Sequence, residues 1–229
     1  MNYTCDEKRK IVKEDYNAIA DTYAKCYSEI DYCKTYIDEF IANLSGKKVL
    51  DIGCGAGQIT DYLTQKGFEV IGLDFSHKLL KIAKRNFPNS KFILADICEY
   101  EQNEQVDGII TKDVLFHLSD ENLVSVLQKF RRMIKPNGNL CIIMDMPKEA
   151  GEQIFVEELD EKYQIYYNYL TPEKLRDLLE KTGFNIENMQ LVKDNDNASS
   201  YATGLMIFQV FNSTICENKM ERHPKLWKV

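Results

Sequence analysis

Three glycines stand within five positions directly behind a short apolar run, in the segment "LDIGCGAG" at residues 50–57. Glycine loses more conformational entropy on folding than other residues, so a cluster is typical where the backbone needs positive φ angles or lies against a ligand. A loop between a parallel strand and the following helix is also where nucleotide-binding loops lie. The segment therefore predicts a binding site for a nucleotide-like ligand at the end of the strand.

The spacing of these glycines argues against a dinucleotide. That fingerprint requires G-x-G-x-x-G/A, and with Gly53 and Gly55 in place its last small residue would fall at Gln58. The third glycine, Gly57, comes one residue early, so the segment reads D-x-G-x-G-x-G from Asp51. A pyrophosphate would then lose the close helix–strand packing that the third glycine provides.

Two more carboxylates follow at the ends of the next two predicted strands. "GLDFS" places Asp74 at one strand end, and "LADI" places Asp96 at the other. Because the carboxyl ends of parallel strands meet at one edge of a sheet, we expect both acids near the glycine loop. A carboxylate at Asp74 can accept hydrogen bonds from both hydroxyls of a ribose. Taken singly, each acid is more often a solvated strand-end residue; the ordered set is what favours a site.

Strands and helices alternate over most of the chain. Apolar strands are predicted at 47–53, 68–74, 91–96, 106–113 and 138–146, and helices at 58–67, 76–87, 120–134 and 171–183. This order is typical of a parallel sheet covered on both faces. Two final strands, 184–192 and 204–211, are joined by the polar "KDNDNASS" and predict an antiparallel pair at the sheet edge.

The N-terminal region has a helical pattern with an aromatic stripe. Between residues 13 and 27 the apolar positions recur at steps of three and four residues. They are Tyr16, Ile19, Ala20, Tyr23 and Tyr27.

The ordered set of motifs resembles the class I S-adenosylmethionine-dependent methyltransferase family over roughly residues 10 to 210. It comprises "VLDIGCGAGQIT", "GLDFS", "LADI", the lead-in "Y-N-x-I-A-x-x-Y" from Tyr16 to Tyr23, and the late "YLTPEKLRDLLEKTGF". The resemblance implies a doubly wound, Rossmann-like α/β fold with a seven-stranded, mostly parallel sheet and an antiparallel C-terminal strand pair. We expect one methyltransferase domain over residues 1–229, with an N-terminal helical lid (1–45), a core (46–211) and a C-terminal tail (212–229).

The same resemblance implies S-adenosyl-L-methionine as cofactor and S-adenosyl-L-homocysteine as product. Asp74 would hold the ribose, Asp96 with Ile97 the adenine, and the backbone of Lys112 with Asp113 the ammonium of the methionine moiety. The full set of expected cofactor-binding residues is Tyr16, Tyr23, Asp51, Gly53, Cys54, Gly55, Gln58, Asp74, Phe75, Ser76, Asp96, Ile97, Lys112 and Asp113. For Cys54 a space-filling role fits as well, and Lys112 can contribute its carbonyl alone.

His117 is the expected catalytic residue. Methyl transfer from a sulfonium is an in-line displacement, so the protein must align the reactants and, where needed, take a proton from the acceptor. His117 follows the fourth strand and titrates in the right range for a general base; the alternative is local hydrogen bonding at a helix start. For Tyr16 and Tyr23 the alternative to cofactor contact is packing on the core.

Composition narrows the class of acceptor. The net charge of −7 and the isoelectric point near 5.2 disfavour a nucleic-acid partner. The seven cysteines form no CxxC pair, so we expect neither a zinc site nor another metal. The polar start and the lack of an apolar run of about 20 residues predict a protein of the cytoplasm without a membrane partner.

A small-molecule acceptor is therefore expected. The alternatives are a protein- or RNA-directed methyltransferase and a non-catalytic S-adenosylmethionine-binding protein. The tyrosine-rich "EKYQIYYNYL" at residues 161–170 fits an aromatic-walled acceptor pocket, a hydrophobic lid or a dimer contact, so a homodimer is possible.

Overall fold

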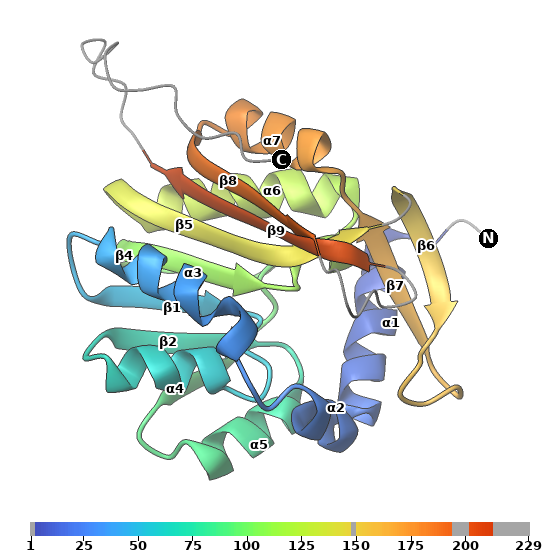
Figure 1. Cartoon of the computed structure of the whole chain (residues 1–229). Helices are drawn as coiled ribbons and strands as arrows, with labels where there is room; N and C mark the ends of the chain where they lie inside the picture. Colours follow the sequence, from blue (N-terminus) through green and yellow to red (C-terminus); the bar gives the residue numbers. More distant parts are fainter. Residues whose placement is uncertain (1–2, 148–149, 194–201, 213–229) are drawn as a thin grey trace.

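A seven-stranded sheet forms the centre of the molecule in the computed structural model, which describes residues 3–147, 150–193 and 202–212. Its strands are β1 (Lys48–Ile52), β2 (Glu69–Asp74), β3 (Lys91–Leu94), β4 (Val106–Lys112), β5 (Ile134–Pro147), β8 (Asn185–Lys193) and β9 (Ala202–Phe211). They lie in the spatial order β3-β2-β1-β4-β5-β9-β8 (Figure 1). The predicted fold class is confirmed.

Helices cover both faces of this sheet. On one face, Val49 of β1 packs in a cluster with α3 (Asp31–Ala42) and α4 (Gln58–Gln65). On the other face, Leu50 and Ile52 pack with α6 (Asp120–Met133) and α7 (Pro172–Lys181). This double burial explains why the parallel strands are apolar almost throughout rather than alternating.

The order of the strands creates a crevice at the carboxyl ends. The chain runs outward from β1 to β2 and β3, then returns to place β4 on the other side of β1. In open α/β sheets, ligands bind at such a reversal of strand order.

Hydroxyl side chains cap two of the helices that follow strands. Ser76 precedes α5 (His77–Asn86), and its hydroxyl accepts a hydrogen bond from the Leu79 N–H at 3.2 Å. Thr171 precedes α7 in the same way, accepting from the Lys174 N–H at 3.1 Å. Side chains of this type satisfy N–H groups that have no partner within the helix.

The antiparallel strand pair is also confirmed. β9 pairs antiparallel with both β5 and β8, so it lies between them and β8 forms the sheet edge. The predicted connection "KDNDNASS" lies almost entirely outside the described residues, as do residues 213–229 of the predicted tail.

A separate hairpin was missed by the sequence prediction. β6 (Gly151–Val156) and β7 (Gln164–Tyr169) pair antiparallel as a two-stranded sheet, and the tyrosine-rich segment forms β7. β7 packs against the N-terminal helix α1 (Cys5–Ala18) and the short 3-10 helix η1 (Leu115–His117). Figure 1 shows this hairpin beside α1, at the end of the sheet where the crevice lies.

Two helices, rather than one, carry the N-terminal aromatic stripe. α1 and α2 (Ala20–Cys26) are separated at Ile19, whose ψ angle is 0°. Both helices contact α5, and α1 also contacts the hairpin. Within the described ranges, no helix is both long and apolar enough to cross a membrane.

Candidate functional site

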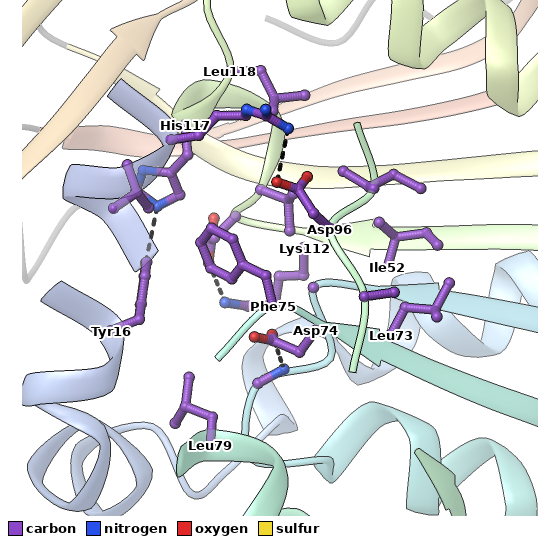
Figure 2. A pocket seen from close by; sticks show the side chains of 18 of the residues that line it. Tyr16, Ile52, Leu73, Asp74, Phe75, Leu79, Asp96, Lys112, His117 and Leu118 are labelled. Carbon is purple, nitrogen blue, oxygen red and sulfur yellow. Dashed lines mark hydrogen bonds and ion pairs between the residues drawn. The ribbon is translucent and has the colours of Figure 1, made fainter. Parts of the chain in front are cut away.

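A pocket lies at the carboxyl ends of the central strands, beneath α1 and α2. It holds about 730 Å³ of empty space, part of it open to solvent. Figure 2 shows side chains from several strand ends and from α1 converging on it. The predicted site residues that line it are Tyr16, Tyr23, Gly53, Gly55, Asp74, Phe75, Asp96, Ile97, Lys112, Asp113 and His117. We call it the main pocket.

The glycine loop forms the floor of the main pocket. Gly53 and Gly55 have φ angles of 70° and 54°, in the left-handed region that side chains rarely adopt. A Cβ on Gly53 would collide with Val114, whereas a Cβ on Gly55 would meet only the Tyr23 ring, at 3.7 Å. At Gly55 a larger side chain would therefore extend into the pocket.

Asp74 is fixed by the backbone on both sides. One of its oxygens accepts from the Gly55 N–H and the other from the Ser76 N–H, each at 2.8 Å. Burial raises the Asp74 pKa to about 6, although these N–H donors oppose the shift. Since a carboxylate oxygen has two acceptor sites, each oxygen can accept one further hydrogen bond from a ligand hydroxyl. Ser76 thus acts through Asp74 and does not line the pocket.

Asp96 anchors α1 to the end of the pocket. Its carboxylate accepts from the Cys98 N–H and forms an ion pair with Arg9, each at 2.8 Å. Sequence reasoning missed Arg9, which also lines the main pocket. Nearby, the buried Lys129 donates to the carbonyls of Ile97 and Cys98 at 3.1 and 3.0 Å, and so holds the loop after β3.

Lys112 and Asp113 form an ion pair at the opposite end of the main pocket. Burial opposes the charge on Lys112, but Asp113 together with Tyr23 and Tyr32 outweighs burial and keeps the Lys112 pKa above its usual value. Asp113 has a φ of 55°, and its carboxylate also accepts from the Asp145 N–H at 3.3 Å. This end therefore presents both a cation and an anion.

Three predicted cofactor residues lie behind the glycine loop, where they line a smaller hollow that continues past Lys112. Asp51 accepts from the Thr60 hydroxyl at 2.6 Å, and burial raises the Asp51 pKa to about 7. Gln58 donates to the Tyr27 carbonyl at 2.9 Å, and Cys54 is buried.

His117 is held by hydrogen bonds at both ring nitrogens. The carbonyl of Tyr166 lies 2.9 Å from Nδ1 and can only accept, so Nδ1 carries the proton. Nε2, 2.9 Å from the Tyr16 hydroxyl, is then the acceptor (Figure 2). Burial lowers the His117 pKa to about 4, which keeps the ring neutral.

A second hollow, the hairpin hollow, lies on the other side of Tyr16 and Tyr23. It holds about 470 Å³ of empty space, part of it open to solvent. It is lined by Tyr16, Ile19, Tyr23, Tyr27, Asp113, Phe116, Asp145, Glu157, Leu159, Ile165 and Tyr167. Tyr16, Tyr23 and Asp113 line both spaces, so the hairpin hollow and the main pocket share a wall.

No group of three or more His, Cys, Asp or Glu residues suited to a metal ion is present within the part of the chain that the structure describes.

Comparisons with known proteins agree with this arrangement. Residues 49–138 match the methyltransferase-domain family. A ubiquinone biosynthesis O-methyltransferase of Leptothrix cholodnii is 25% identical over 180 residues, covering 72% of this chain and 76% of that protein. An uncharacterized methyltransferase of Synechocystis is 36% identical over 107 residues, covering 46% of this chain and 50% of that protein.

A solved structure extends the likeness over nearly the whole chain. The 1,6-didemethyltoxoflavin-N1-methyltransferase of Burkholderia thailandensis, crystallised with 1,6-didemethyltoxoflavin and S-adenosylhomocysteine, gives a TM-score of 0.74. The match has 17% sequence identity and covers 93% of this chain and 92% of that one.

The fold and the strand-end site together define a Rossmann-like protein with a pocket between its glycine loop and strand-end acids. The chain is similar to the S-adenosylmethionine-dependent methyltransferases: residues 49–138 match the methyltransferase domain, and the fold matches that of methyltransferases of solved structure.

Proposed function

We propose that this protein transfers the methyl group of S-adenosylmethionine to a small molecule that enters the hairpin hollow. The observation that carries the proposal is the wall that this hollow shares with the main pocket. A cofactor in the main pocket and an acceptor in the hairpin hollow would meet at Tyr16, Tyr23 and Asp113.

The residues of the main pocket suit the three parts of the cofactor. The fixed Asp74 carboxylate can accept from both ribose hydroxyls. Ile97 and Asp96 can hold the adenine at one end, and the ion pair of Lys112 and Asp113 can hold the charged methionine groups at the other.

When bound, the cofactor supplies an electrophilic methyl group on a positively charged sulfur, and the sulfur leaves without needing a proton. The chain's part is to align the acceptor and exclude water. α1, α2 and the hairpin cover the shared wall, which supports an enclosed, small acceptor rather than a polymer.

His117 in this structure fits a positioning role. Its Nε2 atom already accepts from Tyr16, and its pKa of about 4 makes the imidazole a weak base. We propose that His117 holds the Tyr16 hydroxyl at the shared wall. General base catalysis by His117 itself stays a prediction, and it requires the Tyr16 hydroxyl to turn away.

The test is calorimetric titration with S-adenosylhomocysteine, with NAD⁺ as the matched comparison. We expect S-adenosylhomocysteine to bind in the micromolar range and NAD⁺ to show no saturable binding, since the glycine spacing does not fit a dinucleotide. Binding of NAD⁺ without S-adenosylhomocysteine would overturn the proposal.

Transfer itself is tested with S-adenosylmethionine labelled in its methyl group and pooled cellular metabolites. Label that appears in a low-molecular-weight product supports the small-molecule acceptor. Label that appears only in added protein or RNA contradicts it.

A further inference from the structure

The hairpin hollow combines carboxylates and aromatic rings. Asp113, Asp145 and Glu157 contribute carboxylates from three different segments of the chain. No lysine, arginine or histidine is among the residues that line this hollow. Asp113 is paired with Lys112, whereas Asp145 and Glu157 form no ion pair with any residue in the described ranges.

A further acid lies directly behind this wall. Asp15 of α1 is 1% exposed, and neither of its carboxylate oxygens has a hydrogen-bond donor among the described residues. Burial and the neighbouring Glu157 carboxylate raise the Asp15 pKa to about 8. Glu157 is itself only 7% exposed. Two carboxyl groups buried side by side without a cation do not both ionise readily, so Asp15 keeps its proton near pH 7 and Glu157 carries the charge. A positive ligand in the hollow would stabilise the ionised carboxylates.

Aromatic rings form the rest of the walls. On one side, Tyr16 and Tyr23 contact each other at 5.3 Å between centroids, and Tyr23 contacts Tyr27 at 4.7 Å. On the other side, Phe116 and Tyr167 contact each other at 5.2 Å. The faces of such rings attract cations, and cages of this kind bind organic ammonium groups. The rings and the acids point independently to the same ligand charge.

We propose that the methyl acceptor is a small amine, bound in its protonated form in the hairpin hollow and methylated on nitrogen. This inference rests on the proposed function, because it names the substrate class of the same site. Asp113 is the acid that lines both spaces, and the Asp145 N–H donates to its carboxylate at 3.3 Å. A cationic nitrogen held by these two acids would therefore lie next to the cofactor, rather than a remote part of the acceptor.

A carboxylate of the hollow can take the proton that the ammonium must lose before it is methylated. The ammonium gives a proton to a carboxylate of the hollow, which leaves a lone pair on nitrogen. That lone pair forms the new nitrogen–carbon bond while the carbon–sulfur bond breaks and its electron pair stays on sulfur. Burial raises the Asp145 pKa to about 7, so this carboxylate accepts a proton more readily than an exposed one.

Charge recognition can be tested without turnover. Choline and 3,3-dimethyl-1-butanol have nearly the same shape, but only choline is charged. Titrated into protein saturated with S-adenosylhomocysteine, choline should bind at least ten times more tightly than the uncharged alcohol. Equal binding, tighter binding of the alcohol, or no binding of choline would overturn the inference.

Substitutions of the acids test whether the hairpin hollow causes the preference for choline. Asp145→Asn and Glu157→Gln together should bring the ratio of the two affinities close to one. Asp177→Asn, at an exposed position of α7, should leave the ratio unchanged. A ratio that survives the double substitution contradicts the assignment to this hollow. Thermal unfolding of each variant checks that it is folded.

The two proposals fail in different ways. If S-adenosylhomocysteine does not bind, the proposed function fails. If it binds to the wild type and to both hollow variants but choline has no advantage, only the amine inference fails. With methyl-labelled cofactor, 2-phenylethylamine should be labelled and 2-phenylethanol should not; the reverse result would contradict an amine acceptor.

Discussion

Asp74 shows how single residues build this site from backbone geometry. The loop turns at Gly53 and Gly55 so that the Gly55 N–H points at the Asp74 carboxylate. The N–H of Ser76 approaches from the other side, and the Ser76 hydroxyl also begins α5. The glycine loop and the strand-end acid Asp74 therefore form one hydrogen-bonded unit. This explains why the two motifs occur together in the sequence.

The first prediction concerns Gly55. Gly55→Val should fold but lose S-adenosylhomocysteine binding, because its side chain would extend into the main pocket. The matched control is Gly67→Val, since Gly67 also has a positive φ, of 84°, but has open space around it. Both variants should lose about 1–2 kcal/mol of stability from backbone strain. Retained binding in Gly55→Val, measured by calorimetry, would contradict this view of the pocket.

The second prediction concerns the charge of His117. Because burial lowers its pKa to about 4, its imidazole should remain neutral as the pH falls from 8 to 5. Nuclear magnetic resonance can follow the ring proton shifts, with His117→Gln identifying the signal among the three histidines. A titration midpoint at or above pH 6.5 would instead support direct general base catalysis by His117.

Sequence alone could place the acids but not their partners. Asp74 was predictable because an apolar run ends there and the cap of α5 follows. Asp96 was predictable from the apolar run before it, although β3 ends two residues earlier, at Leu94. Arg9 was not, because its ion pair with Asp96 joins segments 87 residues apart and no local pattern records it. The Tyr16–His117 hydrogen bond, across 101 residues, was hidden for the same reason.

At the scale of elements, the N-terminal helices and the hairpin cover the site, which the sheet itself leaves open. The predicted aromatic stripe was correct in its residues but not in its continuity. The break at Ile19 lets α1 run past the hairpin while α2 packs on α5. The hairpin itself was missed because β7, "QIYYNY", has neighbouring tyrosines in place of a clear apolar–polar alternation.

The third prediction is that α1 and α2 close over the cofactor as a lid. Hydrogen exchange in residues 5–26 should slow strongly when S-adenosylhomocysteine is added, whereas β1 and β4 should change little. Arg9→Gln should reduce this added protection because it removes the ion pair with Asp96, and Lys10→Gln, at an exposed neighbouring position, should not. Equal protection with and without ligand would leave a permanently docked pair of helices.

At the scale of the whole molecule, the site concentrates buried acids. Burial raises the pKa of Asp51 and of Asp145 to about 7 and that of Asp74 to about 6, from an ordinary value of 3.8. At a pH between the ordinary pKa of 3.8 and the raised values of about 6 to 7, the folded protein holds protons that the unfolded chain has released. The stability from these groups is therefore fully present below about pH 4 and is lost as the pH rises through 6 to 7.

The fourth prediction follows from this loss of stability as the pH rises. The melting temperature of the free protein should fall between pH 6.5 and 8, measured in buffers with a small heat of ionisation. His117, with its lowered pKa, acts in the opposite direction, but only as the pH falls below 6.5. Asp51→Asn keeps an acceptor for Thr60 and should flatten the dependence. A melting temperature that rises over this range would contradict the raised pKa values.

At the centre of the proposed site, the Asp74 carboxylate is the group that we expect to hold the cofactor's ribose. Two charge-assisted hydrogen bonds of about 1.5 kcal/mol each correspond to a loss of roughly 100-fold in affinity when the carboxylate is removed. The decisive measurement is therefore calorimetric titration of Asp74→Ala with S-adenosylhomocysteine, beside Asp177→Ala as an exposed control and with thermal unfolding to verify folding. We expect the folded Asp74→Ala variant to bind about 100 times more weakly and the control to bind like the wild type. Unchanged affinity in a folded Asp74→Ala variant would contradict the assignment of the site.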